Sequence, residues 1–182
     1  LVGCEPASAD DPCIASFLES FAARAWRRPV TTAERDALAA LVASIAADLA
    51  DVNAGIEFGA AAVLQSPHFL FRIEIGEPVP DRPDLLRYTS WEMASRLSYL
   101  LQAGPPDAEL LELAAADTLV ELDTIREQAL RLLEDDRARP ALVGFFRDFM
   151  NIRKLDQLDR NAEQFPQMSA TLGPSMREEL ER

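Results

Sequence analysis

The sequence of 182 residues has few of the residues that metal centres and nucleophilic catalysis require, with one histidine and two cysteines. It holds neither the paired Glu-x-x-His motifs of a di-metal bundle nor a Cys-x-x-Cys-His motif for covalent haem. The single histidine, His68, follows a proline among apolar residues, a setting that favours a packed, hydrogen-bonded imidazole over a catalytic one. We therefore predict no catalytic residue, no metal site and no cofactor within this chain.

Basic residues and long apolar runs are also scarce. Eighteen Lys and Arg against 31 Asp and Glu give a formal net charge of -13 at pH 7, which removes the electrostatic attraction on which nucleic-acid binding depends. The longest nearly uninterrupted apolar run, residues 37–47, is shorter than the roughly 20 residues that a spanning helix needs. The sequence thus predicts neither a nucleic-acid partner nor a membrane span.

Helical periodicity dominates what is present. Apolar side chains recur with the spacing of one helix face in eight segments, at residues 12–28, 31–52, 56–65, 89–103, 107–114, 122–133, 142–150 and 175–182. Two of these segments begin with a capping box, formed by Thr31 with Glu34 and by Thr89 with Glu92. After residue 150 the pattern decays into a polar loop. We predict an all-α protein of about eight helices in two packed groups, with little or no strand.

Residues 76–87 interrupt this pattern. They hold three prolines and have no helical period, which is typical of a linker, and only residues 72–75 show the alternation of an extended segment. We therefore predict an N-terminal helical subdomain over residues 1–75, a Pro-rich linker over 76–88 and a second helical subdomain over 89–182. We expect these to be part of a longer protein.

Cys4 and Cys13 flank a short loop bounded by two prolines. A disulfide there would remove about 2.5–3 kcal/mol of unfolded-chain entropy and would indicate an oxidising compartment. Two unrelated thiols explain the same spacing. Residues 1–4 also have the form of a lipoprotein cleavage box, in which Cys4 would carry a lipid. The residues alone leave these three alternatives open.

Arginines in apolar surroundings form the main candidate site, because a guanidinium there needs a carboxylate partner. The set comprises four arginines and three glutamates, Arg27, Arg28, Arg72, Arg96, Glu57, Glu74 and Glu92. It is either a structural ion-pair network between helices, which we favour, or the wall of an anion or substrate pocket. If the pair made by Arg96 is buried, Arg96→Ala should lower stability by roughly 3–5 kcal/mol.

Six short motifs recur in a characteristic order along the chain. They are CEP at residues 4–6, RAWRRPVT at 24–31, LQSPHFLFRIE at 64–74, MASRLSYLL at 93–101, PDAELL at 106–111 and DRAR at 136–139. This order resembles a family of extracytoplasmic helical domains of unknown function, found in planctomycete and myxobacterial proteins and often joined to a c-type cytochrome domain. Each motif is weak alone, but the spaced set covers nearly the whole chain.

The resemblance implies an exported protein with a Cys4–Cys13 disulfide, further helical domains after residue 182, and haem only elsewhere in the parent protein. Members of the family usually carry tryptophan where this chain has Gln102 and Phe149. If those tryptophans form a shared pocket or docking surface, it is altered here. The resemblance assigns no activity to any residue.

Two functions follow from these observations. We expect a non-catalytic module, periplasmic or on the cell surface, that packs against other domains or subunits of a larger, redox-associated protein. The alternative is part of an enzyme whose active site is completed by domains outside this chain, with Arg72, Glu74 and Arg96 as one wall. A deep pocket at these residues favours the enzyme, whereas a flat apolar face on the phenylalanines of residues 145–149 favours the module.

Overall fold

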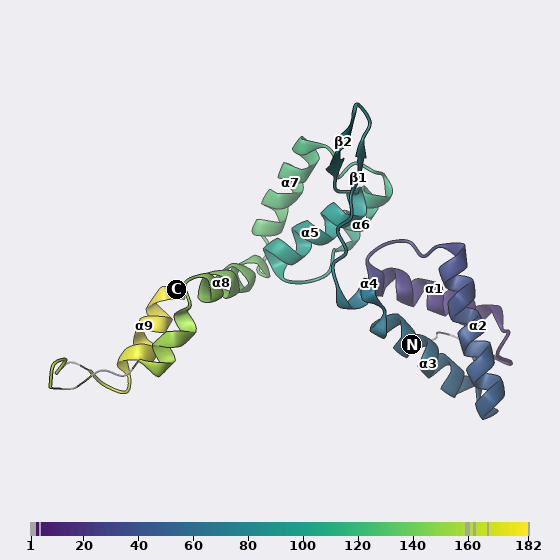
Figure 1. Cartoon of the computed structure of the whole chain (residues 1–182), viewed down its shortest axis with the longest axis horizontal. Helices are drawn as coiled ribbons and strands as arrows, with labels where there is room; N and C mark the ends of the chain where they lie inside the picture. The colour runs from purple at the N-terminus through teal and green to yellow at the C-terminus, as the bar shows by residue number, and fades with distance from the viewer. Residues whose placement is uncertain (1–2, 4, 159–160, 162, 167, 182) are drawn as a thin grey trace.

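The computed structural model describes residues 3, 5–158, 161, 163–166 and 168–181 (Figure 1). Within these residues it contains nine α-helices, one 3₁₀ helix and one two-stranded hairpin. The protein is predominantly helical, which confirms the all-α prediction. None of the helices in the described part of the chain has the length and apolarity that crossing a lipid bilayer requires.

The first four helices form one cluster, which lies at the right of Figure 1. The cap residues start these helices as their chemistry predicts: the Asp11 side chain accepts the amide N–H of Cys13, and Thr31 and Glu34 form the expected capping box. The third helix begins earlier than expected, because Asp51 accepts the amides of residues 53 and 54. The four helices are α1 (Pro12–Trp26), α2 (Thr32–Leu49), α3 (Val52–Gln65) and α4 (Pro67–Leu70).

Small residues bring α2 and α3 close together. A Cβ atom on Gly55 would lie 2.6 Å from the carbonyl oxygen of Val42, and one on Gly59 would lie 2.6 Å from the Val42 side chain. The core of this first cluster is otherwise apolar, and Leu18 and Val42 are fully buried in it. The cluster is therefore held by close steric fit.

Residues 76–87 form a hairpin, where the sequence predicted a linker without strand. Strands β1 (Glu77–Val79) and β2 (Arg82–Arg87) pair antiparallel, with an irregularity between Pro78 and Val79. Prolines argue against a central strand, but in a two-stranded hairpin every strand is an edge, where a missing N–H is tolerated. Residues 72–75, where alternation indicated an extended segment, lie outside any strand. The strand prediction was therefore placed five residues too early.

The second cluster consists of α5 (Ser90–Gln102), α6 (Ala108–Ala115) and α7 (Leu122–Leu133). The predicted capping box of Thr89 and Glu92 starts α5. The buried core of the cluster is made of Ala94, Leu97, Leu110, Ala114, Leu119 and Leu132. The apolar stripes identified in the sequence thus face one another in this cluster.

The last helices form an arm that extends away from the second cluster, at the left of Figure 1. The arm contains α8 (Ala138–Phe149), the 3₁₀ helix η1 (Ile152–Gln157) and α9 (Leu172–Leu180). The sequence predicted a polar loop after residue 150. The 3₁₀ helix forms there instead, with Ile152 buried and with contacts to both α8 and α9.

Candidate functional site

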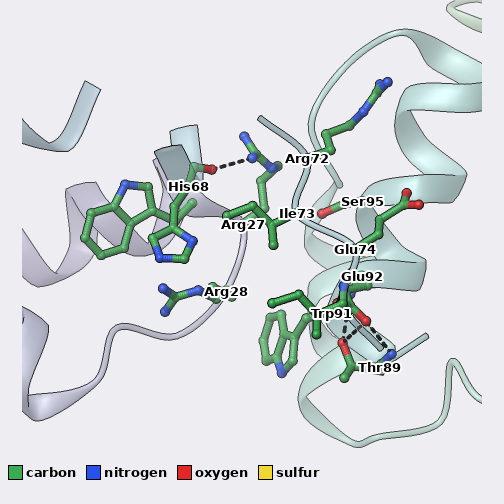
Figure 2. Close-up of a pocket in the computed structure, with 12 residues that line it drawn as sticks. Arg27, Arg28, His68, Arg72, Ile73, Glu74, Thr89, Trp91, Glu92 and Ser95 are labelled. Atoms are coloured by element: carbon green, nitrogen blue, oxygen red, sulfur yellow. Dashed lines mark hydrogen bonds between the residues drawn. The ribbon is translucent and has the colours of Figure 1, made fainter. Parts of the chain in front are cut away.

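A cavity of about 260 Å³ lies between the first cluster and α5, beside the extended residues 71–76 (Figure 2). Aromatic and arginine side chains dominate its lining. The residues that line it are Trp26, Arg27, Arg28, His68, Arg72, Ile73, Glu74, Ile75, Thr89, Trp91, Glu92 and Ser95. Six of the seven residues of the predicted arginine and glutamate set meet at this junction, either in the lining or paired with it. Glu57 does not, since it is exposed on α3.

Arg27 ends α1 in the left-handed conformation, with φ of 59°, and is only 7% exposed. Its guanidinium donates to the carbonyl oxygens of Ala25 (2.9 Å), His68 (2.6 Å) and Phe71 (3.0 Å). A glutamate partner was predicted from the sequence. Carbonyls at the ends of α1 and α4 take that role, because the free carbonyls of a helix C-terminus carry partial negative charge.

Arg28 pairs with Glu34, a carboxylate outside the predicted set. The two side chains form a double hydrogen bond, with N–O distances of 2.6 and 3.0 Å, and the guanidinium lies 5.3 Å from the ring centre of Trp26. The hydrogen bond from Arg28 lowers the pKa of Glu34 from 4.5 to about 2, although partial burial opposes the shift. The sequence could have indicated this pair, because the predicted capping box holds Glu34 in the first turn of α2, shortly after Arg28.

His68 packs beside this pair. Its ring centre lies 5.4 Å from that of Trp26, and its Nε2 atom lies 3.9 Å from Glu34 Oε1. Burial, followed by the charges of Arg28 and Arg27, lowers the pKa of His68 below 6.5 despite the opposing charge of Glu34. The imidazole is therefore neutral at pH 7.

Glu74 and Arg96 form an ion pair of 2.8 Å between the extended segment and α5. The Arg96 guanidinium also lies over the Tyr88 ring, and the Arg72 guanidinium lies over the Tyr99 ring, each at 4.9 Å. The side chain of Arg96 is 47% exposed and that of Glu74 is 28% exposed. The pair is therefore at the surface and not in the interior.

Glu92 fastens the extended segment to the start of α5. Its carboxylate accepts the amide N–H groups of Ile75 (2.7 Å), Gly76 (3.0 Å) and Thr89 (2.8 Å). Partial burial raises the pKa of Glu92, but these N–H donors outweigh it, and the net pKa lies below the ordinary value. Glu92 thus acts on the backbone and not as the partner of an arginine.

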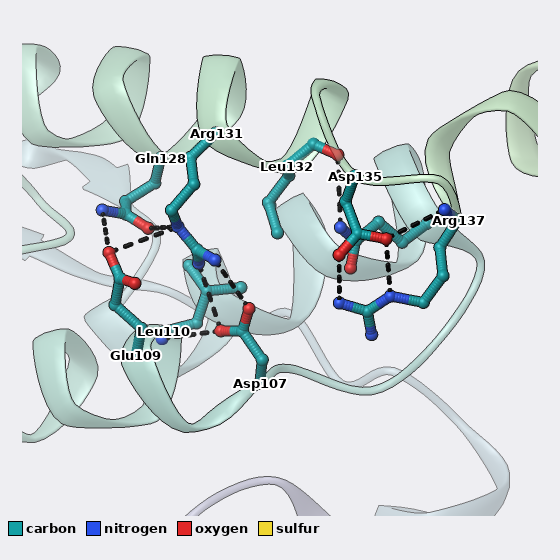
Figure 3. Close-up of polar contacts among 9 residues, drawn as sticks. Asp107, Glu109, Leu110, Gln128, Arg131, Leu132, Asp135 and Arg137 are labelled. Carbon is teal, nitrogen blue, oxygen red and sulfur yellow. Dashed lines mark hydrogen bonds and ion pairs between the residues drawn. The ribbon is translucent and has the colours of Figure 1, made fainter.

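A polar network that the sequence analysis missed lies in the second cluster (Figure 3). Arg131 of α7 donates to Asp107 (2.8 and 3.2 Å) and to Gln128 (2.7 Å), and pairs with Glu109 at 3.2 Å. Partial burial raises the pKa of Asp107, but the hydrogen bond from Arg131 outweighs it and the pKa is lowered. The Asp107 carboxylate also caps α6, so this network joins α6 to α7.

The two positions at which the resembling family carries tryptophan differ in burial. Gln102 is buried, and its amide donates to the carbonyl of Leu132 at 3.2 Å. Phe149 is 74% exposed on α8 and stacks on Phe145, with ring centres 5.7 Å apart. The phenylalanines of residues 145–149 are therefore exposed on α8, the observation that favours a module over an enzyme.

Cys4 lies outside the described residues, so the Cys4–Cys13 disulfide stays a prediction. Cys13 occupies the first turn of α1. In the described part of the chain, no group of three or more His, Cys, Asp or Glu side chains is arranged to hold a metal ion.

Two family models match the chain. Residues 13–74 match the family described as PSD5, a protein of unknown function (DUF1595), and residues 88–182 match PSD4, a protein of unknown function (DUF1592). No curated protein and no solved structure matches the chain. Since the second match covers more than half of its residues, the chain belongs to the PSD4 (DUF1592) family, with a PSD5 (DUF1595) segment preceding that region.

Proposed function

We propose that this chain is a non-catalytic helical module that packs against other domains of a larger protein through the arm. The observation that carries the proposal is an exposed apolar face on α8, made of Leu142, Phe145, Phe146, Phe149 and Met150, each between 37% and 74% exposed. Contiguous exposed apolar surface of this kind marks interaction sites. We name these five residues the α8 face.

The distribution of charge supports the same surface. Residues 138–182 contain seven Lys and Arg and seven Asp and Glu, so the whole acidic excess of the chain lies in residues 1–137. A strongly charged surface repels a partner of like charge, whereas a neutral one carries no such repulsion. Another protein domain that contacts the apolar residues of the arm is therefore repelled less than one that contacts the acidic residues 1–137.

We further propose two subdomains, over residues 1–75 and 89–182, joined by residues 76–88. Two separate apolar cores support this division, as do two family matches that end at residue 74 and begin at residue 88. Hydrogen exchange that reports two cooperative units would test it.

We also propose that the module works outside the cytoplasm, with a Cys4–Cys13 disulfide and with any haem carried by another part of a redox-associated parent protein. The support is the ordered set of motifs described above. Intact mass before and after reduction and alkylation tests the disulfide, since both thiols should become reactive only after reduction. Alkylation without reductant, or a lipid on Cys4, would contradict it.

The packing proposal is tested by comparing the chain alone with its parent protein. Phe149→Cys introduces a thiol in the α8 face, and Leu122→Cys introduces a matched thiol on α7, where Leu122 is 68% exposed. The thiol at position 149 should be alkylated at least about tenfold more slowly in the parent protein than in the chain alone. The thiol at position 122 should react at similar rates in both. Equal rates at position 149 would overturn the proposal.

The cavity supports a second candidate, in which the chain forms part of an enzyme completed by other domains. Of the three residues expected to form one wall, Arg72 and Glu74 line this cavity, whereas Arg96 lies outside the lining and is paired with Glu74. The neutral His68 there is the one imidazole of the chain. This candidate requires that the cavity bind a small molecule. His68→Gln in the parent protein should abolish turnover if the imidazole takes part, and should leave it intact if the chain is only a packing module.

A further inference from the structure

We propose that the cavity between α1 and α5 binds a small organic anion with an apolar body. The proposal goes beyond domain packing, since it concerns the junction of the two clusters and not the arm. It rests on the size of the cavity, on its aromatic and aliphatic walls, and on the sign of the charge around it.

The cavity has the size and the walls for a compact apolar group. A dry cavity of about 150 Å³ holds benzene, so a volume of about 260 Å³ has room for one or two rings. Figure 2 shows His68 and Arg28 on one side and Trp91 on the other, with Ile73 between them. A flat ligand would therefore lie between aromatic groups, an arrangement that such rings favour.

The charged groups at the cavity leave an excess of positive charge. Glu74 is neutralised by Arg96, and Arg28 by Glu34. Among the described residues, neither Arg27 nor Arg72 has a carboxylate partner: Arg27 contacts three carbonyl oxygens and the Tyr99 ring, and Arg72 contacts the Tyr99 ring. Two guanidinium groups without a carboxylate partner thus belong to the lining together with one remaining carboxylate, Glu92, which is already held by three backbone N–H donors.

This local excess is opposite in sign to the net charge of -13 on the chain. A carboxylate or sulfonate entering the cavity would offset it, whereas a cation would add to it. The neutral His68 imidazole offers one further hydrogen bond to such a ligand. The geometry therefore favours an anion over a neutral or cationic molecule of the same shape.

A ligand at this place would contact both clusters at once. The helices of the first cluster pack on one another, and those of the second cluster do likewise. Ring contacts of Arg27 and Arg72 with Tyr99 connect the two across the junction, at 5.7 and 4.9 Å. Binding between two bodies is the arrangement in which a ligand restrains their relative motion.

Calorimetric titration with three probes of one shape tests the proposal. The probes are 2-naphthoate, the neutral 2-naphthalenemethanol and the cation 2-naphthylmethylammonium. Naphthoate should bind at least tenfold more tightly than the alcohol, and the cation should bind more weakly than both. Equal affinity for the three probes, or no measurable binding of naphthoate at millimolar concentration, would overturn the proposal.

Variants place the binding in this cavity. Ile75→Trp enlarges a lining side chain that is 74% exposed and should weaken naphthoate binding at least tenfold. Leu122→Trp makes a similar change at an exposed site on α7 and should not weaken it. Arg72→Gln removes one of the two guanidinium groups that have no carboxylate partner and should lower the preference for naphthoate over the alcohol. The matched change Arg82→Gln, at an exposed ion pair of the hairpin, should keep it. The proposal fails if the paired variants behave alike.

Discussion

The first and second clusters, compared side by side, fill their interiors differently. In the first, Gly55 lets α3 approach the α2 backbone so closely that no side chain fits. The second buries polar residues that are hydrogen-bonded: Ser90 donates to Asp117 at 2.7 Å, and Gln102 to the carbonyl of Leu132. Added side-chain volume should therefore destabilise the first cluster most, whereas the loss of hydrogen-bond partners should destabilise the second.

The largest expected effect comes from adding one methyl group to the first cluster. Gly55→Ala should lower the free energy of unfolding by about 2–3 kcal/mol, because overpacking against a backbone oxygen outweighs the gain in helix propensity. Urea denaturation followed by Trp26 fluorescence in a Trp91→Phe background would measure it.

Gly144→Ala is the matched control, since a Cβ atom on this glycine of α8 meets no atom within 4 Å. There the same substitution should leave stability unchanged or raise it by up to about 1 kcal/mol. Equal changes in the free energy of unfolding for the two substitutions would show that steric crowding between α2 and α3 does not cause the loss at Gly55.

Acid should weaken the first cluster at its rim, where Glu34 meets Arg28. The folded pKa of Glu34, about 2, lies below its ordinary value of 4.5, so its contribution is complete above about pH 4.5 and is lost as the pH falls towards 2. Glu34→Gln should cost about 1–2 kcal/mol at pH 7, allowing for partial exposure of the pair. At pH 2 the variant and the natural chain should be equally stable in urea denaturation.

Glu57→Gln removes an exposed carboxylate of α3 and serves as the control. Its stability should follow that of the natural chain at every pH. A Glu34→Gln variant that stays less stable by the same amount at pH 2 would show that the ion pair is not the cause.

Breaking the polar network of the second cluster should cost less than Gly55→Ala and about as much as Glu34→Gln. Arg131→Met leaves Asp107 and Gln128 without their guanidinium partner, and should lower the free energy of unfolding by about 1–2 kcal/mol. Arg126→Met on the same helix should change it by less than about 0.5 kcal/mol, since Arg126 is 66% exposed and its partner Asp123 is 96% exposed. Urea denaturation followed by far-ultraviolet circular dichroism compares them, and a loss as small as that of Arg126→Met would contradict the role of the network.

The smallest effect is expected between the clusters. The expectation of roughly 3–5 kcal/mol for Arg96→Ala depended on a buried pair, and the Arg96 side chain is 47% exposed. The variant should therefore lose less than about 1 kcal/mol. A loss above about 2 kcal/mol in thermal or urea denaturation would mean that the pair is shielded from water, and that this junction resembles an interior.

Local features of the fold could be predicted from the sequence, because their causes lie within four residues of one another. The capping boxes at Thr31 and Thr89 both form, and the apolar stripes of α5, α6 and α7 do pack together. The hairpin could not be predicted, since its pairing depends on neighbours ten residues apart and its prolines argued against a strand.

The arginines of the candidate site could be predicted from the sequence, but the groups that their side chains bind could not. The composition around Arg27 and Arg96 indicated guanidinium groups in apolar company, and the structure places both at the junction. That Arg27 would meet carbonyls of residues 68 and 71 depended on where α4 lies. No pattern in the sequence encodes the distance between helix ends that are 41 residues apart.

The prolines of the hairpin have a consequence for aggregation. A two-stranded hairpin presents two open edges, and Leu85 and Leu86 of β2 are exposed beside one another, a combination that invites further strands. Pro78 and Pro83 lack the N–H groups that an added strand would need. The hairpin is thus a poor template for fibril growth, although two of its apolar side chains are exposed.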